Sequence, residues 1–288
     1  MNPKPFLKWA GGKSDYADTI LSLFPKEIHT YHEPFVGGGS ILLALLMARK
    51  NGTIRIHGTI YASDVNSTLI GLYKNIQTCP REVIREAVLL LNEMKSGTEP
   101  TSCVYYRIRS TLNGLTPIEK MSVKGSSMFL VLNKTCFRGL YREGPHGFNV
   151  PYGNYKNPVL DEANILLVSS LIQDVVFTHT SFTTIRIDPD DLVYLDPPYA
   201  PESPSSFVSY TYGGFTLQDH HALFKLCHSL KKSSFVLSNS DVGMVRNEFP
   251  PPYTTITLSC RRAIHSKNPG TRTNELLITN IDANARST

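Results

Sequence analysis

An acidic residue, two prolines and a tyrosine stand in a row at Asp196, Pro197, Pro198 and Tyr199, directly after the apolar run 192–195. The prolines fix the backbone and leave carbonyl groups that no local N–H ladder consumes. The Asp196 carboxylate and the Pro197 carbonyl could each accept one hydrogen from an exocyclic amine, and the Tyr199 ring offers a face for a purine. A rigid turn after a strand is the alternative, but an acid before and an aromatic ring after the prolines favour chemistry on an amine.

A second candidate site is the segment 33–40, which places Gly37, Gly38 and Gly39 between a short strand and an apolar helix. Glycines let a ligand approach the backbone closely, and the helix beyond them offers free N–H groups. Asp64 ends the next strand, near the spacing of about 20 residues that suits an acid bonded to a ribose hydroxyl. The pair indicates a nucleoside-containing cofactor, with a plain tight turn as the alternative for the glycines.

The N-terminal segment 6–13 is the third candidate, because the single tryptophan of the chain, Trp9, stands there between two lysines and a glycine pair. Lys13 could neutralise an anionic group of a cofactor, and Lys8 could meet a phosphate or a base edge. The alternative for Trp9 is a structural anchor in the core.

A basic stretch covers residues 101–160, which contain eight Lys or Arg residues against two acidic ones, while the whole chain has a net charge of +5. Aromatic residues such as Phe137, Tyr141 and Phe148 are interleaved with these charges. Positive charge for phosphates together with flat rings for bases is typical of a nucleic-acid interface. A solvated charged face is the alternative.

Strands and helices alternate in the segments that carry the first three candidates. The patterns predict helices near 14–23, 41–49, 80–95, 161–172 and 216–230, with Ser40 capping the second and Thr216 with Asp219 opening the last. They predict strands near 30–33, 54–62, 175–178, 192–195, 235–237, 255–259 and 276–279. This alternation indicates an α/β fold with a mostly parallel sheet. Between about 97 and 158 the periodicity breaks down, which indicates part of an inserted subdomain.

Composition excludes several classes of protein. The chain has 288 residues, of which 41% are hydrophobic, so a sizeable core is expected. The longest apolar run, 41–47, is too short for a bilayer, and the N-terminus has no apolar signal segment. The five cysteines form no C-x-x-C pair, which argues against a zinc site or a disulfide framework. We therefore expect a cytoplasmic protein without a metal or a membrane partner.

These segments, in this order, resemble the Dam-type N6-adenine DNA methyltransferases (D12 class, alpha group). The resemblance covers nearly the whole chain and is carried by seven blocks, at 6–13, 33–40, 132–142, 148–153, 214–217, 237–241 and 261–277. It implies a Rossmann-like, S-adenosylmethionine-dependent methyltransferase sheet with an inserted, largely helical target-recognition domain. Residues 1–75 and 159–288 would form the catalytic domain, and 76–158 the insert.

The resemblance also implies roles for individual residues. The catalytic residues would be Asp196, Pro197, Pro198 and Tyr199, with Tyr199 stacking on the flipped base. The residues implied to bind S-adenosylmethionine are Trp9, Ala10, Gly11, Lys13, Phe35, Gly37, Gly39, Ser40, Asp64, Val65 and Asp196. Those implied to contact double-stranded DNA are Lys8, Asn133, Lys134, Phe137, Arg138, Leu140, Arg142, Pro151, Arg261 and Arg262.

Within this DNA-binding set, Arg142 matches an arginine that reads a guanine, Leu140 and Pro151 match apolar contacts to the outer bases, and Lys8 matches a contact to the first base. The match favours GATC as the target. Arg138 departs from the family, whose members usually carry Asn there. We expect a monomer that transfers the methyl group directly, with a dimer on DNA as the alternative. The rival functions are methylation of an RNA adenine, of cytosine N4 or of a protein glutamine, and DNA binding without catalysis.

Overall fold

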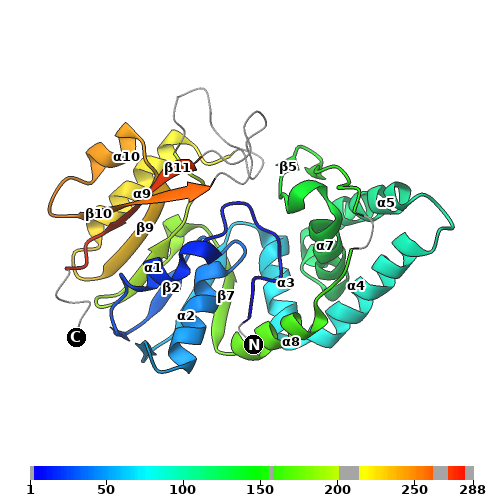
Figure 1. Ribbon diagram of the computed structural model, residues 1–288, viewed down its shortest axis with the longest axis horizontal. Helices are drawn as coiled ribbons and strands as arrows, with labels where there is room; N and C mark the ends of the chain where they lie inside the picture. Colours follow the sequence, from blue (N-terminus) through cyan, green and yellow to red (C-terminus); the bar gives the residue numbers. More distant parts are fainter. Residues whose placement is uncertain (1–2, 156–157, 201–213, 262–271, 283–288) are drawn as a thin grey trace.

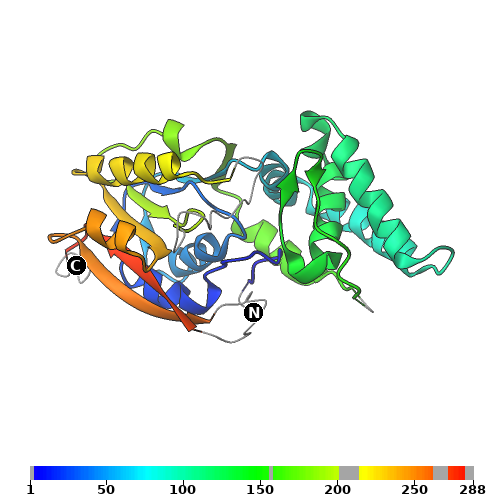
Figure 2. The same cartoon turned by 90° about the horizontal axis from the view of Figure 1, so that it is seen from above.

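The computed structural model describes residues 3–155, 158–200, 214–261 and 272–282, and contains one large sheet beside a group of helices (Figures 1 and 2). The sheet has seven strands in the order β10-β11-β9-β8-β2-β4-β7. Their bounds are β2 Tyr31–Glu33, β4 Ile60–Asp64, β7 Val175–His179, β8 Leu192–Leu195, β9 Ser234–Ser240, β10 Thr254–Arg261 and β11 Arg272–Thr279. Strands β7, β4, β2, β8 and β9 pair in parallel, and β11 and β10 complete the sheet in antiparallel order.

Both faces of the sheet centre are covered, as the side-chain alternation of β8 shows. Leu192 and Tyr194 belong to one hydrophobic cluster, which includes α2 (Ser40–Lys50) and α3 (Ser67–Thr78). Val193 and Leu195 belong to a second cluster with α9 (Leu217–Ser229) and α10 (Gly243–Glu248). Because successive side chains of a strand point to opposite faces, a strand covered on both sides is apolar throughout. This covering explains why 192–195 is a continuous apolar run.

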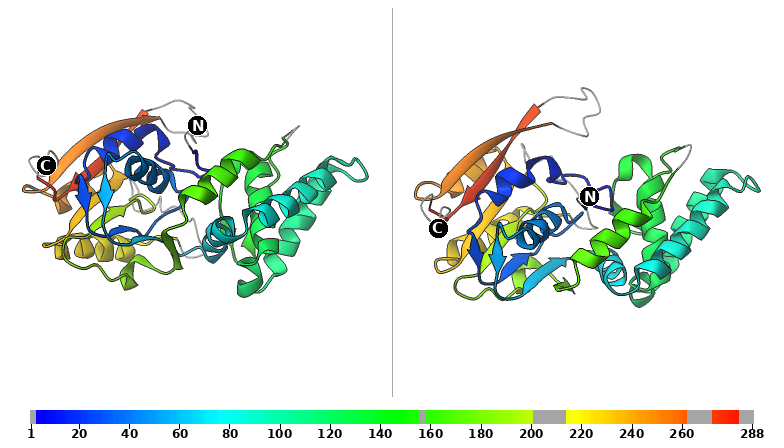
Figure 3. Two further views of the ribbon diagram at one scale, coloured as in Figure 1. Left: turned by 90° about the horizontal axis from the view of Figure 1, so that it is seen from below. Right: turned by 60° about the horizontal axis from the view of Figure 1, so that its bottom comes forward.

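The helices that follow α3 and precede β7 stand beside the sheet as a separate group (Figure 3). They are α4 (Pro80–Lys95), α5 (Thr101–Gly114), α6 (Pro117–Lys120), α7 (Val123–Thr135) and, leading back to the sheet, α8 (Glu162–Leu171). Helix α7 packs against α3, α4 and α5. It is buried on nearly every side, so its sequence has no polar face and gives no amphipathic signal. This burial is why the periodicity failed to reveal α7.

The chain after α7 runs through a short 3-10 turn (Phe137–Gly139) into the hairpin β5 (Glu143–Gly144) and β6 (Gly147–Phe148). The remaining short elements are α1 (Ala17–Leu21), the 3-10 turns Ser14–Tyr16 and Phe182–Thr184, and the pair β1 (Glu27–Ile28) and β3 (Arg55–Ile56). Among the described residues, no helix has the length and apolar character to cross a membrane.

Three predictions of local structure are corrected, and one helix was missed. The strand expected at 54–62 is two strands, β3 and β4. Helix α3 was not predicted. Ser40 does not cap α2; the capping position is held by Gly39, whose φ of 73° lies in the left-handed region, and no side chain bonds there. The helix expected near 14–23 begins as the 3-10 turn Ser14–Tyr16, and α1 starts only after it. The capping box of Thr216 and Asp219 is confirmed.

Candidate active site

Three loops meet where β2, β4 and β8 end, because these strands are parallel neighbours with β2 in the middle. Strand β2 leads into residues 34–39, here called the glycine loop, and β8 leads into the Asp196–Tyr199 turn. Strand β4 ends at Asp64. In open α/β sheets, ligands bind at this edge, where the strand order reverses. A cavity of about 480 Å³ lies there. All the residues expected to bind the cofactor, together with Pro197, Pro198 and Tyr199, line it.

The glycine loop is packed tightly against two aromatic side chains. A Cβ atom at Gly37 would come within 2.7 Å of Trp9 Nε1, and one at Gly39 within 2.6 Å of the Tyr73 hydroxyl. Both glycines have positive φ, 45° and 73°. The buried Tyr73 hydroxyl donates a hydrogen bond to the Gly37 carbonyl at 3.0 Å. These positions therefore require glycine for conformation and for space.

Asp64 holds the loops around it through its carboxylate. It accepts hydrogen bonds from the backbone N–H of Gly37 at 3.2 Å and of Asn66 at 2.9 Å. A carboxylate has about four acceptor sites, so it can still accept bonds from ligand hydroxyls. Burial raises the pKa of Asp64 to about 6, although the two N–H donors act to lower it.

Asp196 lies beside a buried lysine. Lys13 Nζ is 3.0 Å from Asp196 Oδ1 and 3.9 Å from Glu275 Oε2, and it donates a hydrogen bond to the Gly11 carbonyl at 2.6 Å. Burial lowers the pKa of Lys13, but the carboxylates of Asp196 and Glu275 outweigh it and raise that pKa above its ordinary value. Burial raises the pKa of Asp196, and the Lys13 ammonium opposes that rise. The lysine is therefore a charged partner of the Asp196 side chain.

Acidic groups outnumber basic ones in the cavity. The described residues that line it include Glu33, Asp64, Asp196, Asp219 and Glu275, but only one lysine or arginine, Lys13. Burial raises the pKa of Glu33 to about 8, and the Tyr31 hydroxyl donates to its carboxyl group at 2.7 Å. Glu33 is therefore mostly uncharged at neutral pH, but the other four carboxyl groups still outnumber Lys13 and favour a ligand that carries positive charge.

Aromatic rings form the apolar walls. Trp9 stacks on Tyr141, with ring centroids 5.5 Å apart and an interplanar angle of 19°. Phe35, Phe182 and Phe215 form a second group, with centroid separations of 5.3, 5.9 and 5.8 Å. Flat apolar walls with a few polar groups are typical of pockets for a nucleoside. Tyr141 thus links the expected DNA-binding segment to the cavity.

The residues expected to contact DNA are partly gathered on the surface beside the cavity. Lys8, Phe137, Arg138, Arg142 and Pro151 are exposed, and Lys134 and Leu140 are half-buried. Lys8 Nζ lies 4.1 Å from the centre of the Tyr155 ring, and Arg142 donates to Asn149 Oδ1 at 2.7 Å. Arg138 has a φ of 55°, a left-handed conformation that asparagine adopts more readily than arginine. Arg261 ends β10, and Arg262 lies outside the described residues.

Asn133 differs from this exposed set because it is buried, with 1% of its surface accessible. Its amide accepts a bond from the Lys8 N–H at 2.9 Å and donates to the Lys8 carbonyl at 2.7 Å and the Gly139 carbonyl at 3.4 Å. A Cβ at Gly139 would lie 2.3 Å from Lys8 Cβ. The expected DNA contact of Asn133 is therefore corrected: its side chain joins the N-terminal segment to the 137–142 turn from inside the protein.

Sequence reasoning gave no cavity role to Tyr141, Phe182, Phe215 and Glu275. Glu33 was included in the candidate segment 33–40, but without a role of its own. Tyr141 was assigned to the basic-aromatic stretch alone. Glu275 comes from β11, near the far end of the chain, and no local pattern connects it with the cavity.

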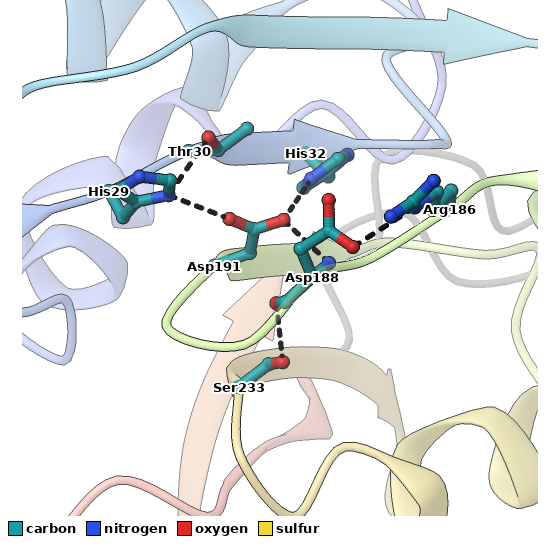
Figure 4. A network of polar contacts seen from close by, with 7 residues as sticks. All are labelled: His29, Thr30, His32, Arg186, Asp188, Asp191 and Ser233. Carbon is teal, nitrogen blue, oxygen red and sulfur yellow. Dashed lines mark hydrogen bonds and ion pairs between the residues drawn. The ribbon is translucent and has the colours of Figure 1, made fainter.

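A second polar cluster lies at the opposite, amino-terminal ends of β2 and β8 (Figure 4). The buried Asp191 carboxylate lies 2.9 Å from His32 Nε2 and 3.3 Å from His29 Nδ1, and it accepts a bond from the Asp188 N–H at 2.9 Å. Burial raises the pKa of Asp191, but these three donors outweigh it and lower that pKa below its ordinary value. The cluster holds together the two strands that carry the glycine loop and the Asp196 turn.

The sequence of this chain is similar to those of known DNA methyltransferases. The family model for "D12 class N6 adenine-specific DNA methyltransferase" matches residues 9–258. The type II methyltransferase M.MjaIII of Methanocaldococcus jannaschii is 39% identical over 253 residues, which cover 83% of this chain and 85% of the relative. The DNA adenine methylases of Vibrio cholerae and Escherichia coli K12 are 34% and 33% identical, over 84% and 93% of this chain and 83% and 91% of their own lengths.

Proposed function

Since the chain belongs to the D12 class of N6 adenine-specific DNA methyltransferases, whose methyl donor is S-adenosylmethionine, we propose that it methylates the adenine of GATC in duplex DNA after turning that base out of the helix. The observation that supports this proposal best is the meeting of the Asp196–Tyr199 turn with the glycine loop around one acidic, aromatic-walled cavity. In this proposal, the Asp196–Tyr199 turn binds the amine of the target base and the glycine loop binds the nucleoside of the donor, and both line the same cavity.

The residues of the cavity fit S-adenosylmethionine. Gly37 and Gly39 let the backbone of the loop pack closely against Trp9 and Tyr73 while it lines the cavity. The Asp64 carboxylate can accept bonds from ribose hydroxyls, and Phe35 or the Trp9–Tyr141 pair can cover a base. The excess of carboxyl groups suits the sulfonium and the ammonium group of this molecule. When bound, the donor supplies an electrophilic methyl carbon.

In the proposed reaction the protein orients the adenine amine. The Asp196 carboxylate and the Pro197 carbonyl accept its two hydrogens, which withdraws the nitrogen lone pair from the ring and aims it at the methyl carbon. Tyr199 stacks on the extruded base. Once the amine carries the methyl group it must lose a proton, and the Asp196 carboxylate is placed to accept it. Lys13 keeps the Asp196 side chain in place throughout.

DNA recognition belongs to the insert, residues 76–158, together with Lys8 in this proposal. The exposed Arg142 would read a guanine, while Lys134 and Arg138 would meet phosphates. The adenine and DNA specificity of the family does not support the rival functions on RNA, on cytosine N4 or on protein glutamine. We propose that the enzyme acts as a monomer, because each strand of a palindromic site can be presented in turn.

Asp196→Ala tests the catalytic part of the proposal. The variant should retain its fold by circular dichroism, with a lower thermal midpoint because Lys13 loses its partner, but should fail to methylate DNA. Retained methylation would remove Asp196 from the mechanism. Sequencing with modified-base detection, on DNA from cells that express the wild-type chain, tests the target. N6-methyladenine confined to GATC is the expected result, and methylation at another sequence would refute the assigned site.

A further inference from the structure

The Tyr199 side chain is tied to the last strand of the sheet. Its hydroxyl donates a hydrogen bond to Glu275 Oε2 at 2.7 Å, between residues 76 positions apart in the sequence. Tyr199 follows β8, Glu275 belongs to β11, and β9 lies between these two strands in the sheet. The bond therefore reaches across a strand to join the two side chains.

The backbone of the same turn is held separately, by the end of β9. Asn239 Oδ1 accepts a bond from the Ala200 N–H at 3.0 Å, and the Ser240 hydroxyl donates to the Ala200 carbonyl at 2.5 Å. These contacts fix the main chain directly after Tyr199. They do not fix the rotation of its ring, which depends on what the ring and the hydroxyl touch.

Lys13, Glu275 and Asp196 are polar groups close to the Tyr199 side chain, and of the two carboxylates it is Glu275 that accepts the 2.7 Å bond from its hydroxyl. Lys13 Nζ lies 4.8 Å from the ring centre, and it is also within ion-pair distance of Asp196 and Glu275. Burial and the two carboxylates raise the pKa of the Tyr199 hydroxyl well above its ordinary value, so it remains a donor. The hydrogen bond from the Tyr199 hydroxyl to the Glu275 carboxylate is therefore kept at neutral pH, where the hydroxyl remains protonated.

Resting on the proposed function, we propose that Glu275 is a positioning residue that fixes the Tyr199 ring through its hydroxyl, so that the ring face stands ready for the extruded adenine. Glu275 acts through Tyr199 and does not touch the reacting atoms. A ring held in place before the base arrives loses less side-chain freedom when the base stacks on it.

Four variants test this role: Glu275→Ala, Glu275→Gln, Tyr199→Phe and the double variant Glu275→Ala/Tyr199→Phe. The measurements are kcat on a GATC duplex and the Kd of S-adenosylmethionine by calorimetry. We expect Glu275→Ala and Tyr199→Phe each to lower kcat by about tenfold, as for a lost hydrogen bond to a charged group, with the Kd changed less than about twofold. The double variant should be no slower than either single variant, because both remove one bond.

Glu275→Gln should retain kcat within about threefold, because its amide oxygen can still accept from Tyr199 while the charge is gone. Loss in Glu275→Gln equal to that in Glu275→Ala would show that the charge beside Lys13 matters, and would overturn the proposal. So would additive losses, full activity of Tyr199→Phe, or a Kd that rises in parallel with the fall in kcat. Glu248→Ala is the matched control, since Glu248 bonds His228 away from the cavity.

A duplex with 2-aminopurine at the target adenine separates the two proposals. Wild-type enzyme should raise the fluorescence of this base by extruding it, and Glu275→Ala and Tyr199→Phe should raise it further because a loosened ring quenches less. No rise with the wild-type enzyme or with either variant would refute base extrusion, and the role of Glu275 with it. A normal rise combined with additive losses of kcat would refute the role of Glu275 alone.

Discussion

Trp9 lies flat against Tyr141, with ring centroids 5.5 Å apart. Trp9 follows Lys8, which is expected to contact the first base, and Tyr141 precedes Arg142, which is expected to read a guanine. The stack therefore forms a wall of the donor cavity from the two segments that are proposed to meet DNA.

A double-mutant cycle on this pair should reveal coupling. Trp9→Ala and Tyr141→Ala are each expected to weaken S-adenosylmethionine binding, with a coupling free energy of about 0.5–1.5 kcal/mol, as for a stacked aromatic pair. Calorimetry on the four proteins of the cycle measures it. Tyr106→Ala, which truncates an exposed ring on α5, is the control and should leave the affinity unchanged. A coupling of zero would mean that the two rings act separately.

Gly39→Ala and Gly52→Ala form a matched pair, because the two glycines have φ values of 73° and 74°. An alanine at such a φ costs about 1–2 kcal/mol. At Gly52 a Cβ meets nothing within 4 Å, whereas at Gly39 it meets the buried Tyr73 hydroxyl at 2.6 Å. Gly39→Ala should therefore lower the free energy of unfolding more than Gly52→Ala does, and should also impair donor binding. Equal losses in urea titrations would show that the Tyr73 contact relaxes freely.

The pKa of Asp64, raised to about 6 by burial, predicts how donor binding depends on pH. A carboxylate that accepts bonds from ribose hydroxyls binds them best when ionised. Protonation therefore competes with binding, and the affinity should fall as the pH drops through about 6. Between pH 7 and pH 5 we expect a loss of about tenfold, since one pKa unit corresponds to about 1.4 kcal/mol. Asp64→Asn should bind more weakly but without this slope, and an unchanged slope would place its origin elsewhere.

Arg142→Ala should weaken discrimination at one base pair of the target. A lost bidentate contact to guanine costs about 1–3 kcal/mol of discrimination, to be measured as the ratio of kcat/KM on GATC and on duplexes with single substitutions. Asn149→Ala removes the group that holds the Arg142 guanidinium at 2.7 Å, and should give a smaller loss at the same position. A uniform loss on all duplexes, with a shallower salt dependence, would instead make Arg142 a phosphate contact.

Asp191 should stabilise the fold in a pH-dependent way. Its pKa in the folded protein is lowered, so its contribution is present above the ordinary pKa of an aspartate and is lost as the pH falls through the folded value. Asp191→Asn should lower the free energy of unfolding by about 1–3 kcal/mol near neutral pH, and the gap in this free energy between variant and wild type should narrow only below about pH 4. Asp174→Asn, in an exposed pair with Arg49, should cost less than about 1 kcal/mol. A gap that widens on acidification would contradict this assignment.

Much of the cavity could be predicted from the sequence because its residues come in short segments that each end a strand. The glycines of the glycine loop, Asp64 and Asp196 are neighbours because β2 lies between β4 and β8 in the sheet. Glu275 and Phe215 could not be predicted in this way, because they reach the cavity only through the sheet order and the packing of α9. For the same reason Asn133 was taken for a surface residue, since nothing local shows that α7 is buried.

The helices of the insert show the other limit of sequence reasoning. Helix α4 has one buried face, and its predicted bounds agree with the structure. Helix α7 is buried on nearly all sides, so its sequence lacks the alternation of polar and apolar residues that identifies a surface helix. The hairpin β5–β6 is too short for a strand pattern to develop.

The contact of Gly139 with Lys8 limits how this protein can diverge. A side chain at Gly139 would collide with Lys8, and Asn133 ties both backbones together. A descendant that replaces Gly139 while rebuilding the 137–142 turn must also rebuild the N-terminal segment, which continues through Trp9 into the wall of the cavity. Under the proposed function, changes in which DNA is marked are thereby constrained by the need to keep binding the same methyl donor.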